Sequence, residues 1–229
     1  MMILASDFDD TLYFLDDKEK TKKNIEAIRK FTSSGNTLCI ITGRNYTDLK
    51  QLLIEHSIPY TYLICEDGAK IFNGVDYCLD TIQLEKYEVE QIVKVIEDNN
   101  WDYYLDDGYS KTQNYDDCVK VVVECDDKEK QKEIVDIIKN EIPIHVYASR
   151  SHINIINKIV NKANAIKRLF NIEKLDYSKL KVIGDNDNDY EMINEFNGVI
   201  VGKHHEKLDT LNCQVFETLS EYIEELMKN

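Results

Sequence analysis

Apolar runs and helically spaced apolar residues alternate along the first third of the chain. Residues 2–8 form a short apolar run that ends in carboxylates, and residues 21–33 then carry apolar side chains at a helical spacing. A second strand is expected at 37–42, a second helix at 46–56 and a third strand at 62–65. Continuous apolar strands joined by helices favour a parallel sheet that is covered on both faces.

The last third continues in the same style. Helices are expected at 162–170, 189–196 and 220–227, with strands at 181–184 and 199–202. Both ends of the sequence therefore belong to one α/β core, which we expect to be a Rossmann-like parallel sheet with helices on both faces.

The middle of the chain follows a different order of elements. It reads as helix, strand, strand, helix, strand, strand, with these elements expected at 84–98, 101–106, 119–125, 128–140, 144–148 and 152–156. This order predicts a small α+β cap with an antiparallel sheet, inserted at residues 80–155 into a core of residues 1–79 and 156–229. Ligands of parallel sheets bind beyond the carboxyl ends of the strands, so an insertion over that edge would act as a lid.

Composition narrows the possible partners. The net charge of −15 disfavours nucleic acid and anionic lipid, and no apolar run is long enough to span a membrane. The first residues lack the basic flank of a signal peptide. None of the six cysteines forms a CxxC pair, so reduced thiols in a cytoplasmic protein are expected and a structural zinc site is not.

Two carboxylates follow the first predicted strand. Asp7 and Asp9 are two residues apart, so they would point the same way along an extended chain. Like charges this close repel unless a cation or a proton lies between them. The pattern favours a metal site with one carboxylate free to attack and one to carry protons, and its alternative is an acidic turn.

A second acidic segment, Gly-Asp-Asn-Asp-Asn-Asp at residues 184–189, also follows an apolar strand. Such a density of hard oxygen ligands suits Mg²⁺ or Ca²⁺. A calcium loop of the EF-hand type would need Gly and Glu where this chain has Tyr190 and Phe196, which argues against it. A solvated loop is the remaining alternative.

Two further positions could bind phosphate. Thr42 and Gly43 follow the second strand, where a hydroxyl and nearby amides can reach a phosphate oxygen, although such a pair is also ordinary turn chemistry. Lys162 begins a predicted helix, where the dipole disfavours a cation. That placement is explained if its ammonium faces an anion in a cleft, and the alternative is a surface lysine.

Taken in order, these four segments resemble the motifs of the haloacid dehalogenase superfamily of phosphohydrolases. The place of the insertion resembles the type 2 cap of its Cof-like and sucrose-phosphatase-like subfamily. Residues 153–169 and 65–69 are also similar to that subfamily, although Asp67 stands where the family usually has Asn. The resemblance implies that Asp7 is the nucleophile and Asp9 the acid and base.

The resemblance also implies a Mg²⁺-dependent phosphatase that acts on a small phosphate ester through an aspartyl-phosphate intermediate. Its implied metal ligands are Asp7, the Asp9 main-chain carbonyl, Asp185 and, through water, Asp189, while Thr42, Gly43 and Lys162 would bind phosphate. Supporting or substrate contacts are expected from Asn188, Arg44, Asp67, Arg150 and Ser151. A phosphomutase and a non-catalytic phosphate-binding module remain alternatives, and a monomer or weak homodimer is expected.

Overall fold

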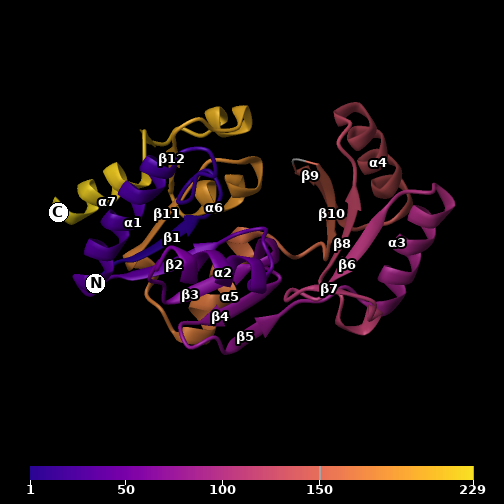
Figure 1. Cartoon of the computed structure of the whole chain (residues 1–229), viewed down its shortest axis with the longest axis horizontal. Helices are drawn as coiled ribbons and strands as arrows, with labels where there is room; N and C mark the ends of the chain where they lie inside the picture. Colours follow the sequence, from indigo (N-terminus) through magenta and orange to yellow (C-terminus); the bar gives the residue numbers. More distant parts are fainter. Residues whose placement is uncertain (150, 229) are drawn as a thin grey trace.

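The computed structural model describes residues 1–149 and 151–228, which fold around two sheets. Figure 1 shows the larger sheet with both chain ends on one side of the molecule and the smaller sheet on the other. The larger sheet has the strand order β13-β12-β11-β1-β2-β3-β4-β5, and the smaller has the order β7-β6-β8-β10-β9. Within the described residues, no helix combines the length and apolar character needed to cross a bilayer.

The larger sheet is parallel from β13 to β3, as the apolar runs predict. Its strands are β1 (Ile3–Asp7), β2 (Thr37–Ile41), β3 (Tyr62–Cys65), β4 (Lys70–Asn73), β5 (Cys78–Thr81), β11 (Leu180–Gly184), β12 (Val199–Val201) and β13 (Val215–Phe216). The antiparallel strands β4 and β5 were not predicted from the sequence. The turn from β3 to β4 is too short for the crossover that a parallel pair would need.

Helices cover both faces of this sheet, which confirms the α/β core. Apolar residues of α1, α2 and α7 pack on one face and those of α5 and α6 on the other. These helices are α1 (Lys18–Ser33), α2 (Tyr46–Glu55), α5 (Lys162–Glu173), α6 (Tyr190–Glu195) and α7 (Leu219–Lys228). Short 3₁₀ turns also occur, at η1 (Glu66–Gly68), η2 (Tyr115–Asp117), η3 (Tyr177–Lys179), η4 (Asp187–Asp189) and η5 (Glu206–Thr210).

The smaller sheet and two helices form the predicted α+β cap. Its elements are α3 (Lys86–Asp98), β6 (Tyr103–Asp106), β7 (Lys111–Thr112), β8 (Lys120–Glu124), α4 (Lys128–Glu141), β9 (His145–Ser149) and β10 (His152–Ile156). Figure 1 shows α3 and α4 on the face of this sheet that is turned away from the core. Strands β9 and β10, expected at 144–148 and 152–156, pair antiparallel.

Side chains alternate across the cap sheet and thereby divide its two faces. Val121 and Val123 of β8 pack with the cap helices, as does Ile153 of β10. The side chains of Lys120 and Asn154 point to the opposite face of the sheet and line a cleft toward the core. One face of the cap sheet is therefore an apolar core and the other is a polar wall.

The expected boundary at residue 80 falls inside β5 of the core sheet, and residue 156 is the last residue of β10 in the cap. We therefore propose that the cap covers residues 82–156, with the chain crossing between the two units just outside that range.

Candidate active site

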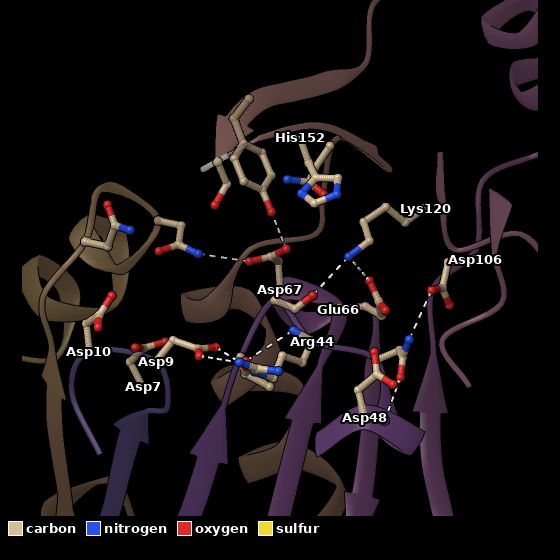
Figure 2. A pocket seen from close by; sticks show the side chains of 18 of the residues that line it. Asp7, Asp9, Asp10, Arg44, Asp48, Glu66, Asp67, Asp106, Lys120 and His152 are labelled. Carbon is tan, nitrogen blue, oxygen red and sulfur yellow. Dashed lines mark hydrogen bonds and ion pairs between the residues drawn. The ribbon is translucent and has the colours of Figure 1, made fainter. Parts of the chain in front are cut away.

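The site lies where the carboxyl ends of the central strands meet. Asp7 ends β1, Thr42 follows β2, Asp67 follows β3 and Asp185 follows β11. These strands are neighbours in the sheet, and Asp7 is paired in register with the last residue of β2. The segments open into a cleft of ≈ 310 Å³ between the core and the cap, part of which is shown in Figure 2.

Lys162 joins two carboxylates at the base of the site. Its Nζ donates hydrogen bonds to Asp7 Oδ1 at 2.5 Å and to Asp189 Oδ1 at 2.6 Å. The residue is 1% exposed and starts α5, whose N-cap is Asn161. Burial lowers the pKa of Lys162, but the charges of Asp189 and Asp7 outweigh this effect and raise it. The ammonium therefore stays charged and is held in a fixed position.

The acidic segment after β11 is ordered by its own backbone. Asp189 Oδ2 accepts hydrogen bonds from the amides of Asp185, at 3.0 Å, and Asn186, at 2.9 Å. Thr11 Oγ1 donates to Asp185 Oδ1 at 2.6 Å. Both oxygens of Asp189 are thus engaged by the protein, whereas Asp185 and Asp7 each have one oxygen with no such bond described.

A divalent cation fits this arrangement. Asp7, Asp185 and Asp189 each offer an oxygen, and the three oxygens lie within 4.8 Å of one another. Burial raises the pKa of Asp7 well above its usual value and the pKa of Asp185 to about 7, and in both cases neighbouring carboxylates add to the effect. Three buried carboxylates therefore share one fixed cation, Lys162, and their oxygens are of the kind that Mg²⁺ prefers.

The carboxylate of Asp9 does not belong to this trio and pairs with Arg44 instead. Arg44 Nε donates to Asp9 Oδ2 at 2.8 Å, and a terminal guanidinium nitrogen donates to Asp9 Oδ1 at 2.7 Å. Both side chains are about one-third exposed, and Figure 2 shows them facing each other across the cleft floor. The two residues are therefore brought together, which the sequence did not indicate.

The turn that follows β2 is clamped against the turn that follows β3. The amide of Asp67 donates to Thr42 O at 2.9 Å, and the amide of Glu66 donates to Arg44 O at 3.0 Å. Glu66 and Asp67 adopt positive φ values of 52° and 55°, and in this left-handed conformation their amides donate to the turn that follows β2. A Cβ on Gly43 would lie 3.2 Å from the Asp67 carboxylate oxygens, so glycine is what permits the close approach.

Two residues of the cap reach into this clamp, and the sequence analysis missed both. Lys120 Nζ forms a salt bridge with Glu66 and donates to Gly43 O at 2.9 Å. Tyr147 donates its hydroxyl proton to Asp67 Oδ2. A signal for Lys120 existed, because the strand alternation puts it on the face opposite to Val121, but the sequence could not show what that face meets.

The family model of haloacid dehalogenase-like hydrolases matches residues 4–111 and 105–221 of this sequence. The chain belongs to this family. It is therefore an enzyme of the hydrolase class, as the order of its motifs predicted. No curated protein sequence matches the chain.

Solved structures share the fold of this hydrolase at low sequence identity. A phosphatase of the haloalkanoate superfamily from Bacteroides thetaiotaomicron is 16% identical, with a TM-score of 0.82 over 100% of this chain and 94% of that one. A COF-like hydrolase from Plasmodium vivax is 15% identical, with a TM-score of 0.87 over 100% and 96%. A subclass IIB sugar phosphatase is 17% identical, with a TM-score of 0.80 over 100% and 98%.

Of the remaining side chains that were expected to contact substrate, Asn188 lies in the site, Ser151 lies in the cap and Arg150 is not described. Asn188 Nδ2 donates to Asp67 Oδ1 at 2.9 Å, so the amide and Tyr147 hold the Asp67 carboxylate from two sides. The carbonyl of Ser151 accepts a hydrogen bond from the amide of Cys125 in the cap, and Arg150 lies outside the described residues. Further cap side chains that line the cleft are Tyr104, Asp106, Ser149, His152 and Asn154.

Proposed function

We propose that the protein is a Mg²⁺-dependent phosphatase that hydrolyses a small phosphorylated metabolite, such as a sugar phosphate, through an aspartyl-phosphate intermediate. The observation that carries this proposal is the position of Asp7. Its Oδ1 is held by Lys162 at 2.5 Å, and it lines the cleft beside Asp185 and Asp189. A carboxylate fixed by one oxygen can present the other to an electrophile. The shared fold of a sugar phosphatase supports the substrate class.

The ion would be held by Asp7, Asp185 and the main-chain carbonyl of Asp9, with Asp189 acting through water. It would supply the positive charge that lets an anionic nucleophile approach an anionic phosphate. Both oxygens of Asp189 already bind Lys162 and backbone amides, which supports a positioning role for this residue.

In the first step, an oxygen of Asp7 attacks phosphorus, and the bond from phosphorus to the leaving oxygen breaks. Protonated Asp9 gives its proton to that oxygen, so the alcohol leaves as a neutral molecule. The Thr42 hydroxyl and the Lys162 ammonium stabilise the negative charge on the phosphoryl oxygens. Asp9 faces Arg44 in this structure, so it must separate from that partner to act as the acid.

In the second step, water attacks the phosphorus of the aspartyl phosphate. The Asp9 carboxylate, left without its proton by the first step, takes a proton from that water. The bond between phosphorus and the Asp7 oxygen breaks, which releases inorganic phosphate and restores both aspartates to their starting forms.

The test is phosphate release from a panel of small phosphate esters, with and without Mg²⁺. Wild type should release phosphate only with the ion, Asp7→Asn should release none, and the exposed control Asp126→Asn should behave as wild type. Full activity of Asp7→Asn would contradict the assignment. Conversion of a sugar phosphate to an isomeric phosphate, without free phosphate, would instead indicate a phosphomutase.

The proposal extends to the setting in which the enzyme works. Its partner is a small-molecule ester, and the net charge of −15 argues against a nucleic acid. Its six cysteines are free thiols, which supports a cytoplasmic location. We expect a monomer or a weak homodimer, which sedimentation would test.

A further inference from the structure

The phosphate-binding turn Thr42-Gly43-Arg44 has three main-chain carbonyls, and each accepts a hydrogen bond. Backbone amides of the adjacent core turn hold the first and the third carbonyl. The middle carbonyl, that of Gly43, accepts its bond from Lys120 Nζ at 2.9 Å, and Lys120 belongs to β8 of the cap. The cap therefore holds the central peptide of a turn that is otherwise built from the core.

Because a peptide group is planar, the contact of Lys120 with the Gly43 carbonyl also affects Thr42. The carbonyl of Gly43 and the N–H of Arg44 belong to one planar trans peptide, so they point in opposite directions. While Lys120 fixes the carbonyl, the N–H donates to Thr42 Oγ1 at 3.2 Å. The Thr42 oxygen accepts that bond, which leaves its own proton free to be donated to a ligand in the cleft.

We infer that Lys120 is a positioning residue, which orients the Thr42 hydroxyl. Through this contact, phosphate binding depends on how the cap packs against the core. The inference rests on the proposed function, because that function places a phosphoryl group beside Thr42. Figure 2 shows Lys120 reaching from the cap toward Glu66 at the edge of the cleft.

The surroundings of Lys120 favour this role over direct contact with a leaving group. Lys120 is 6% exposed, and its salt-bridge partner Glu66 is 0% exposed. Glu66 and Gly43 engage two of the three donors of the ammonium, so little remains for a substrate. A second cap contact lies next to the turn, where Gly108 O accepts a hydrogen bond from the amide of Tyr46 at 2.9 Å.

The test compares the affinity for inorganic phosphate, in the presence of Mg²⁺, with the turnover of two esters that differ only in leaving group, such as a phenyl and a sugar phosphate. The main variant is Lys120→Met with Glu66→Gln, which keeps the stem of the lysine and leaves no unpaired buried carboxylate. The matched control is Lys111→Met, because Lys111 is an exposed cap lysine with its own carboxylate partner.

A positioning role predicts that the double variant binds inorganic phosphate about five- to tenfold more weakly, the factor that one hydrogen bond of ordinary net strength represents. The value of kcat of the double variant should fall by a similar factor for both esters. The single variant Lys120→Ala should show the same two effects, and added n-propylamine should restore part of its phosphate affinity and part of its kcat. Unchanged phosphate affinity with a raised KM for one ester alone would overturn the inference, because Lys120 would then contact that leaving group.

Hydrogen exchange in the wild type keeps the inference testable if the double variant fails to fold. The Arg44 amide should be protected before any phosphate is added, because Lys120 has already oriented it. Exchange at the rate of an open amide, with protection only after phosphate binds, would overturn the inference.

The binding measurement also separates this inference from the proposed function. A wild type that binds phosphate but hydrolyses no ester would contradict the function, while weaker binding by the double variant would still support the role of Lys120. A wild type that hydrolyses esters, with a double variant of unchanged phosphate affinity, would contradict the inference alone. Failure of the wild type to bind phosphate would contradict both.

Discussion

Arg44 holds Asp9 by two hydrogen bonds, from Nε at 2.8 Å and from a terminal nitrogen at 2.7 Å. This fork uses both carboxylate oxygens and is the geometry in which a guanidinium binds a carboxylate most specifically. In the proposed mechanism Asp9 must give and take a proton, which it cannot do with both oxygens bound to Arg44. We therefore expect substrate binding to draw Arg44 toward the phosphate and release Asp9.

Replacement of Arg44 tests this relationship. Arg44→Met should lower kcat/KM by about one to two orders of magnitude, because the guanidinium that is expected to turn from Asp9 to the phosphate is lost, together with its charge-assisted hydrogen bonds. Arg44→Lys should lie between this variant and wild type, since an ammonium cannot form the two-pronged bond. Steady-state kinetics across pH would check both, and an Arg44→Met variant as active as wild type would show that the pair plays no part in turnover.

Removal of Lys162 should destabilise the enzyme as well as inactivate it. Lys162→Met would leave Asp7 and Asp189 buried without their shared cation, and breaking a buried pair in this way costs about 3–5 kcal/mol. Urea unfolding would measure the loss, and Mg²⁺ should restore part of it. Lys167→Met, on the exposed side of the same helix, should lose less than about 1 kcal/mol. Equal losses in the two variants would contradict the buried role.

The metal-free protein should lose stability as pH rises from about 4 to about 8. Burial raises the pKa of Glu66 to about 8 against the opposing charge of Lys120, and it raises the pKa of Asp185 to about 7. A folded state with raised carboxyl pKa values binds more protons than the unfolded state, so its stability is greatest below the unfolded values and falls through this window, by at most about 1.4 kcal/mol per pH unit for each proton.

Thermal unfolding at several pH values, with and without Mg²⁺, would check this dependence. Magnesium should flatten the part that comes from Asp185 and from Asp7, whose pKa burial also raises, and Glu66→Gln should remove the part that comes from Glu66. Stability that rises with pH over this window would show that these carboxylates are already ionised in the folded protein.

A glycine at the end of β11 is required by the position of Asp189. A Cβ on Gly184 would lie 2.5 Å from Asp189 Cγ, which is closer than atoms can approach. Gly184→Ala should cost about 1–3 kcal/mol through overpacking and should also abolish activity, because it displaces the partner of Lys162. Gly35→Ala is the control, since it strains a φ of 82° far from the site and should cost stability but not activity. An active Gly184→Ala variant would argue against this placement of Asp189.

Much of the fold and part of the candidate site could be read from the sequence, because those features are local. Apolar runs and helical spacing predicted the parallel core and the inserted cap. Asp7 and Asp185 lie at the ends of apolar runs that predicted buried strands, and the carboxyl ends of parallel strands meet at one edge of a sheet. A lysine at a helix start, where the dipole disfavours it, pointed in the same way to an anion opposite Lys162.

Other features were decided by the tertiary structure alone. Lys120 meets Gly43 across 77 residues of sequence, and Tyr147 meets Asp67 across 80. Strand alternation places such side chains on one face of the cap sheet, but the packing of the cap against the core determines which partners that face meets. The pairing of Asp9 with Arg44 likewise depends on how two loop backbones leave neighbouring strands. The sequence by itself therefore determined which groups gather at the sheet edge, and the packing of cap on core determined which of them touch.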